Sequence, residues 1–205
     1  MNRADEVDRL KDIFRILNGD VDEAMAYGRS NPSEFAHRSL VRAHFALIEG
    51  LSFQLRQVTL ASLIDTDFLT SAEIALLREE RYSIDSSGNP KTQEVFNSFL
   101  PSLLFSIRCY LKNHGASYQV NTTCDGWLSM QKAVKIRNRV THPKNVESLE
   151  LSDQDLKNFR DAAIWWKNTM LEMFSACSDA DEYWRSKHQK FIDVLVFRIF
   201  LAPAQ

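Results

Sequence analysis

The feature that most constrains the fold is a regular row of apolar residues in the last third of the chain. The row recurs at alternating intervals of three and four positions and consists of Leu156, Phe159, Ala163, Trp166, Met170, Met173 and Cys177. This spacing places every member on one face of an α-helix. The segment is therefore predicted to pack inside a helical bundle or against a partner chain.

Helical patterns also account for the rest of the chain, and no segment shows the sustained alternation of a strand. Breakers and capping signals predict helices over about 3–17, 31–64, 70–82, 92–113, 125–141, 152–178 and 179–201, with a helical turn near 22–27 and a loop over 83–90. Asn18–Gly19 is expected to end the first helix, and Pro101 to kink or break the fourth. Thr70 and Glu73 form a capping box. The fold class is therefore predicted to be an all-α bundle of six or seven helices.

The length of the chain suits a single domain. Its 205 residues can bury a substantial core, so we expect residues 1–205 to form one domain, with 179–205 either integrated into it or added as a C-terminal helical appendage. The apolar run 191–201 is too short to span a bilayer and contains Asp193 and Arg198. Three roles remain open for this segment: closing the core, lying at a dimer interface, or docking a partner.

The cysteines and the N-terminus predict a cytoplasmic protein. Cys109, Cys124 and Cys177 are odd in number and far apart, which is typical of reduced thiols and not of a metal knuckle. The first residues contain no apolar segment that could act as a signal peptide. The histidines form no HExxH or i,i+4 pattern, so we expect no metal, no cofactor and no membrane association.

Positive charge is concentrated in residues 131–144, although the net charge of the chain is only −2. This stretch holds five Lys or Arg and no acidic residue. A local patch of this kind can attract a phosphate-containing partner. Lys135, Arg139 and Lys144 are predicted to bind nucleic acid, the alternative being that they form a solvated helix face. On the second predicted helix, a polar row of Arg38, Arg42, Glu49 and Arg56 is interpreted as an internal ion-pair network instead of a functional wall.

Three residues of the basic stretch have the chemistry needed to cut RNA without a metal. The His142 imidazole can accept or deliver a proton near neutral pH. The Arg137 guanidinium can stabilise the charge of a phosphorane, and the Asn138 amide can orient the groups. On an ideal helix Arg137 and His142 point about 140° apart, so they converge only if the backbone leaves helical geometry near Thr141 or if two copies meet. The alternative is that His142 only caps the helix and Arg137 joins a surface ion pair.

The segment 136–144 resembles the signature of the HEPN superfamily (higher eukaryotes and prokaryotes nucleotide-binding). That signature is an Arg, usually a polar residue after it, and a His four to six residues further on, near the end of an internal helix. Arg137, Asn138 and His142 fit it. The similarity extends from about residue 3 to about 178 and includes Asp125, Gly126, Trp127, Leu151, Ser152, Asp153, Trp165, Trp166, Arg42, Phe45, Glu49 and Gly50.

The resemblance implies an all-α homodimer in which two motif helices meet across a two-fold axis and form a composite cleft for RNA. Active members are metal-independent endoribonucleases that leave a cyclic phosphate, and many are toxins or antiviral defence effectors. We accordingly expect catalytic roles for Arg137, Asn138 and His142, with RNA and an antitoxin or defence-system protein as partners. Lys144 stands where toxins that are silenced by a nucleotidyltransferase often carry Tyr, which argues against that form of control.

Two other functions remain open from the sequence. Some HEPN members bind RNA, a nucleotide or a partner protein without cutting, and such a module needs the same basic patch but no proton transfer. A purely structural helical protein would instead use the apolar row of residues 156–177 to bind its partner.

Overall fold

The computed structural model describes residues 2–62 and 68–200, except for the side chains of residue 184 and residues 188–200. The described chain is mostly helical, as predicted. Its helices are α1 (Arg3–Ser30), α2 (Glu34–Ala61), α3 (Ser71–Leu77), α4 (Phe99–His114), α5 (Asp125–Thr141) and α6 (Asp153–Phe200). A hairpin of β1 (Glu80–Ile84) and β2 (Pro90–Glu94) follows α3, and a short 3-10 helix, Glu147–Leu149, lies between α5 and α6.

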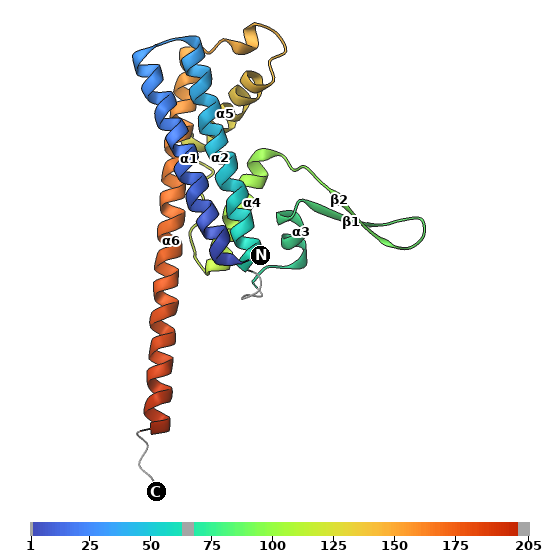
Figure 1. The fold of residues 1–205 in the computed structure, drawn as a ribbon, viewed down its shortest axis with the longest axis vertical. Helices are drawn as coiled ribbons and strands as arrows, with labels where there is room; N and C mark the ends of the chain where they lie inside the picture. The colour runs from blue at the N-terminus through green and yellow to red at the C-terminus, as the bar shows by residue number, and fades with distance from the viewer. Residues whose placement is uncertain (1, 63–67, 201–205) are drawn as a thin grey trace.

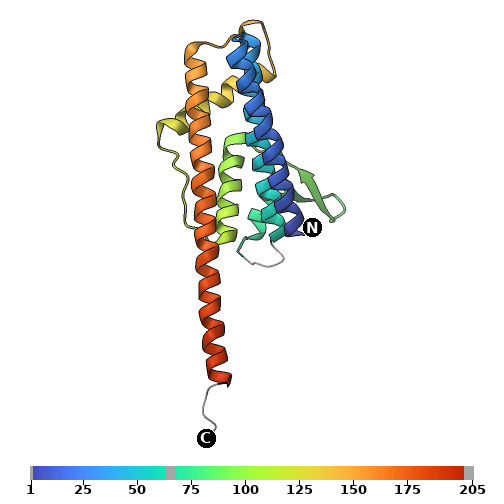
Figure 2. The ribbon, with the colours of Figure 1, turned by 60° about the vertical axis from the view of Figure 1, so that its left-hand side comes forward.

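The helices form an elongated bundle, and the long α6 runs along one side of it (Figures 1 and 2). α1 packs along α2, α5 packs on α6, and α4 contacts both α2 and α6. The hairpin projects sideways from the bundle, and the C-terminal part of α6 extends beyond the other helices. The end of α5, which carries the predicted motif residues, lies at the end of the bundle where α2, α5 and the start of α6 lie together (Figure 1).

One main apolar core joins α1, α2, α4, α5 and α6. Its fully buried members include Leu55, Leu103, Ile107, Met130 and Met173. The apolar row of α6 enters this core, since Phe159, Trp166, Met170 and Cys177 are also buried. The prediction that the row packs inside a bundle is therefore confirmed.

α1 does not end where the sequence predicted. It continues through Asn18 and Gly19 to Ser30, so the expected stop is wrong. The Asn18 amide donates to the Asp22 carboxylate at 3.0 Å across the expected break, and Val21 is buried. Tertiary packing and this local hydrogen bond outweigh the turn preference of the Asn–Gly pair.

The boundaries of α2 and α4 also differ from expectation. Ser33, not Asn31, caps α2, and its hydroxyl accepts from the Ala36 amide at 3.2 Å. Pro101 lies in the first turn of α4, where backbone N–H groups have no helical partner, so the predicted kink or break is wrong. Gly115, with φ of 66°, ends α4 in the left-handed conformation that favours glycine.

α6 is one helix of 48 residues, whereas two were predicted. No glycine or proline lies between residues 153 and 200, so no backbone signal interrupts it. Residues 179–200 accordingly continue the bundle helix. In the described part of the chain, no helix is both long enough and apolar enough to cross a membrane.

The hairpin was not predicted. Its strands pair antiparallel from Glu80 with Glu94 to Ile84 with Pro90, and β2 is exposed throughout. Because neither face is buried in a core, the strands lack the apolar alternation that reveals most strands in a sequence. The predicted third helix ends at Leu77 instead of near residue 82, although its capping box is present: the Thr70 hydroxyl accepts from the Glu73 amide at 3.2 Å.

Candidate functional site

The site is built on the last turn of α5. Helical geometry ends at His142, whose φ of −126° and ψ of 66° differ from helical values, while its N–H still donates to the Asn138 carbonyl at 2.9 Å. Pro143 then prevents a further turn. The backbone therefore leaves helical geometry directly after Thr141, as predicted, but among the described residues no hydrogen bond or ion pair joins Arg137 to His142.

Close packing against α6 fixes the other end of α5. Gly126 lies in the first turn, and a Cβ atom there would come within 2.7 Å of the Trp165 Cβ. The ring centroids of Trp127 and Trp165 are 5.2 Å apart, and the Trp165 indole N–H donates to the Asn121 carbonyl at 3.2 Å. α5 is thus held against α6 by groups that leave little room for adjustment.

Arg137 lies between three helices. Its guanidinium forms an ion pair with Glu49 of α2 and lies 6.0 Å from the ring centroids of Phe45 and Phe99. It also donates to the Asn138 amide oxygen at 2.8 Å. Burial lowers the pKa of Arg137, but a guanidinium beside a carboxylate stays charged at neutral pH.

His142 is exposed, and among the described residues its ring has no hydrogen-bond or ion-pair partner. Asn138 is also exposed, and its amide oxygen accepts a hydrogen bond from Arg137. The structure therefore brings Arg137 and Asn138 into contact and leaves the His142 imidazole open to solvent. An imidazole without a protein partner is free to exchange a proton with a bound molecule.

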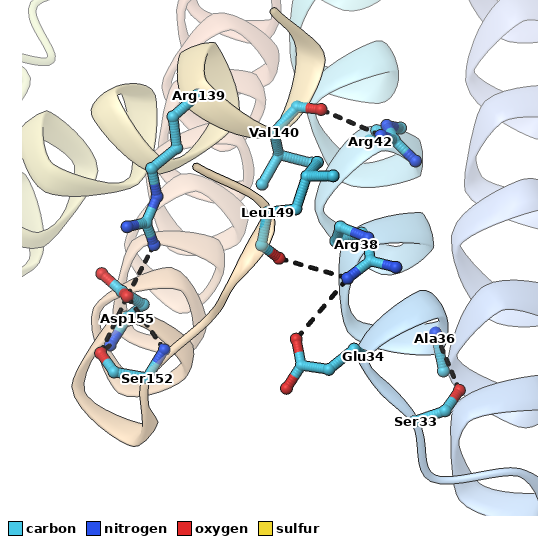
Figure 3. A network of polar contacts seen from close by, with 10 residues as sticks. All are labelled: Ser33, Glu34, Ala36, Arg38, Arg42, Arg139, Val140, Leu149, Ser152 and Asp155. Carbon is cyan, nitrogen blue, oxygen red and sulfur yellow. Dashed lines mark hydrogen bonds and ion pairs between the residues drawn. The ribbon is translucent and has the colours of Figure 1, made fainter. Parts of the chain in front are cut away.

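The basic stretch presents less free charge than its composition indicates. Lys135 and Lys144 are exposed. Arg139, however, forms an ion pair of 2.7 Å with Asp155 at the start of α6 (Figure 3). Burial alone would raise the pKa of Asp155, but hydrogen bonds from Ser152 and Arg139 outweigh it, and the pKa lies below its usual value. The carboxylate is therefore ionised at neutral pH and offsets the charge of Arg139.

Two arginines of α2 reach across to α5 and to the connection that follows it (Figure 3). Arg42 donates to the Val140 carbonyl at 2.9 Å. Arg38 donates to the Leu149 carbonyl at 3.2 Å and lies 3.7 Å from Glu34. These contacts bind the last turn of α5 and the end of the following connection to α2.

The predicted ion-pair network along α2 is confirmed in part: Arg38, Glu49 and Arg56 each form an ion pair, but the pairs do not join into one network. Glu49 pairs with Arg137 of α5, and Arg56 pairs with Glu79 at 2.5 Å, next to the hairpin. The charged residues of this row contact other elements and not one another, because α5, the connection after it and the segment before the hairpin pack against this face of α2. Phe45, Glu49 and Phe99 are neighbours of Arg137 that were not predicted as site residues, and no local pattern links positions so far apart.

In the part of the chain that the structure describes, no group of three or more His, Cys, Asp or Glu residues is arranged to hold a metal ion. Comparison of the chain with protein-family models, with curated proteins and with solved structures gives no significant match.

Proposed function

We propose that this chain is a metal-independent endoribonuclease of the HEPN type, acting as a homodimer in toxin or defence biology. The observation that carries the proposal is the exposed His142 imidazole, which has no partner among the described residues, at the end of the helix that also holds Arg137 and Asn138 in contact. A proton carrier, a charge stabiliser and an orienting amide thus share one helix end. RNA cleavage needs these three kinds of group.

The reaction balances without a metal. The ribose 2′ oxygen attacks the adjacent phosphorus, and its proton passes to a neutral imidazole. The bond from phosphorus to the 5′ oxygen breaks, and the same imidazole, now protonated, gives the proton to that oxygen. The products carry a 2′,3′-cyclic phosphate and a free 5′ hydroxyl. Arg137 stabilises the extra negative charge of the phosphorane.

A two-fold dimer can place Arg137 of one chain beside His142 of the other. In a symmetric dimer the same surface patch of both chains meets across the axis. Arg137 of one protomer would then act beside His142 of the partner subunit. This arrangement also removes the difficulty that the two residues lie five positions apart in one chain.

The second candidate is a non-catalytic module that binds RNA. The ion pair between Arg137 and Glu49 favours it, because a carboxylate beside the guanidinium competes with a phosphate for the same donors. In this alternative the exposed cations bind the RNA backbone and no proton is transferred.

The test is incubation of the pure protein with single-stranded RNA in EDTA, with mapping of the product ends. We expect wild-type protein to produce cyclic phosphate ends, and His142→Ala to lower the rate by about 10²- to 10⁴-fold. Thr141→Ala, at the exposed neighbouring position, serves as the control and should retain the wild-type rate. Equal cleavage by His142→Ala would overturn the proposed role, whereas binding without cleavage by wild-type protein would favour the second candidate.

A further inference from the structure

Most arginines near the end of α5 already have an acidic partner. Arg137 pairs with Glu49, and Arg139 pairs with Asp155. Arg38 lies on the face of α2 that adjoins the end of α5, and its Nη1 is 3.7 Å from Oε2 of Glu34. A carboxylate in contact with a guanidinium offsets its charge, so each of these arginines offers an incoming phosphate less attraction than a free one.

Arg42 differs from them. It is exposed, and among the residues whose side chains are described no carboxylate contacts it. Its Nη2 donates a hydrogen bond to the Val140 carbonyl at 2.9 Å. A guanidinium has five N–H donors, so most of them remain for a ligand.

The position of Arg42 matters because α5 presents its C-terminal end to the site. The unpaired carbonyls there carry partial negative charge, equivalent to roughly half an electron, and repel a phosphate. Arg42 covers one of these carbonyls, only two residues before His142 (Figure 3). The hydrogen bond also fixes the guanidinium in place, so less side-chain freedom is lost when a ligand binds.

We propose that Arg42 is a further RNA-binding residue that contacts a backbone phosphate next to His142. The proposal rests on the proposed function, since it takes RNA as the ligand of the α5 end. A contact to phosphate sets the position of the strand and carries no base preference. Arg42 therefore contributes affinity for any single strand, through its charge and its fixed donors.

The experiment measures binding of a labelled single-stranded RNA by fluorescence anisotropy over a series of salt concentrations, in the His142→Ala background to prevent cleavage. Arg42→Gln should weaken binding several-fold and reduce the slope of log K against log salt by about 0.7, the value for one phosphate contact on a single strand. Arg42→Lys should keep the slope, because it keeps the charge. The matched control is Arg38→Gln, one turn away and also bonded to a carbonyl, which should leave the slope unchanged because Glu34 already offsets that charge.

A thermal melt of each variant separates loss of binding from loss of folding. An unchanged slope in folded Arg42→Gln, or an equal decrease in Arg38→Gln, overturns the inference. Absence of RNA binding by the His142→Ala protein overturns it as well. The proposed nuclease activity fails separately, if wild-type protein binds RNA in this Arg42-dependent way but does not cut it.

Discussion

At the scale of single residues, Lys135 and Arg139 differ in what they can offer to a phosphate. Lys135 is exposed, whereas Arg139 is held by Asp155 at 2.7 Å. Lys135→Gln should therefore weaken RNA binding several-fold and reduce the salt slope by about 0.7. The double change Arg139→Gln with Asp155→Asn removes an ion pair without altering net charge and should leave both quantities near their wild-type values. Anisotropy titrations at several salt concentrations measure both effects.

Asp155→Asn suits this comparison because an amide oxygen can still accept the hydrogen bond that Asp155 receives from the Ser152 amide. If the double change weakened binding as much as Lys135→Gln does, Arg139 would contact RNA in spite of its partner. The original expectation for Arg139 as a nucleic-acid-binding residue would then hold.

The candidate site could be found in the sequence only to the extent that its residues are neighbours in the chain. Arg137, Asn138 and His142 lie within six consecutive positions, so a motif search along the sequence can group them. Glu49, which pairs with Arg137, and Arg42, which reaches Val140, come from α2. Their contacts depend on how α2 packs against α5, and spacing along one helix does not determine that.

At the scale of elements, Gly19 gives a direct test of the continuous α1. The residue is helical, and an added Cβ would have no atom within 4 Å. Gly19→Ala should therefore raise the free energy of unfolding by about 0.5–1 kcal/mol, because alanine loses less backbone freedom than glycine. Urea unfolding followed by circular dichroism measures this change.

Gly126→Ala is the matched comparison, since it makes the same chemical change where α5 touches α6. The added Cβ would lie 2.7 Å from the Trp165 Cβ, and the variant should lose about 1–3 kcal/mol. A Gly19→Ala protein less stable than wild type would indicate that the chain bends at Asn18–Gly19, as the sequence suggested.

Sequence signals predicted helix ends correctly where residues close in the chain satisfy the backbone groups at that end. The capping box of Thr70 with Glu73 is an example, because it satisfies backbone groups within a few residues. The signals failed where packing decides. The helix penalty of Gly19 is only about 1 kcal/mol, which the burial of a single side chain such as Val21 can exceed.

At the scale of the whole molecule, the composite site can be tested by mixing two inactive variants. Arg137→Ala and His142→Ala proteins should each be inactive alone. If Arg137 of one chain acts with His142 of the partner subunit, a mixed dimer contains one intact site. After unfolding and refolding together, the mixture should recover about a quarter of wild-type cleavage, because half of the dimers are mixed and each holds one of two sites.

Mixing the Arg137→Ala protein with a double variant, Arg137→Ala with His142→Ala, provides the control, because no pairing of these chains restores a complete site. Recovery in the first mixture alone supports a site shared between chains. Background activity in both mixtures would mean that both residues must come from one chain.

The length of α6 affects how a dimer can be distinguished experimentally from a monomer. Beyond the contact of His114 with Asp181, α6 stands clear of the bundle in both views (Figures 1 and 2). A helix of 48 residues measures about 72 Å, and a projecting rod raises the frictional drag of a small molecule. A monomer of 23.6 kDa with this elongated shape would elute early from a sizing column, at an apparent mass close to that of a dimer. Sedimentation equilibrium, which reports mass independently of outline, is the measurement that separates one copy from two.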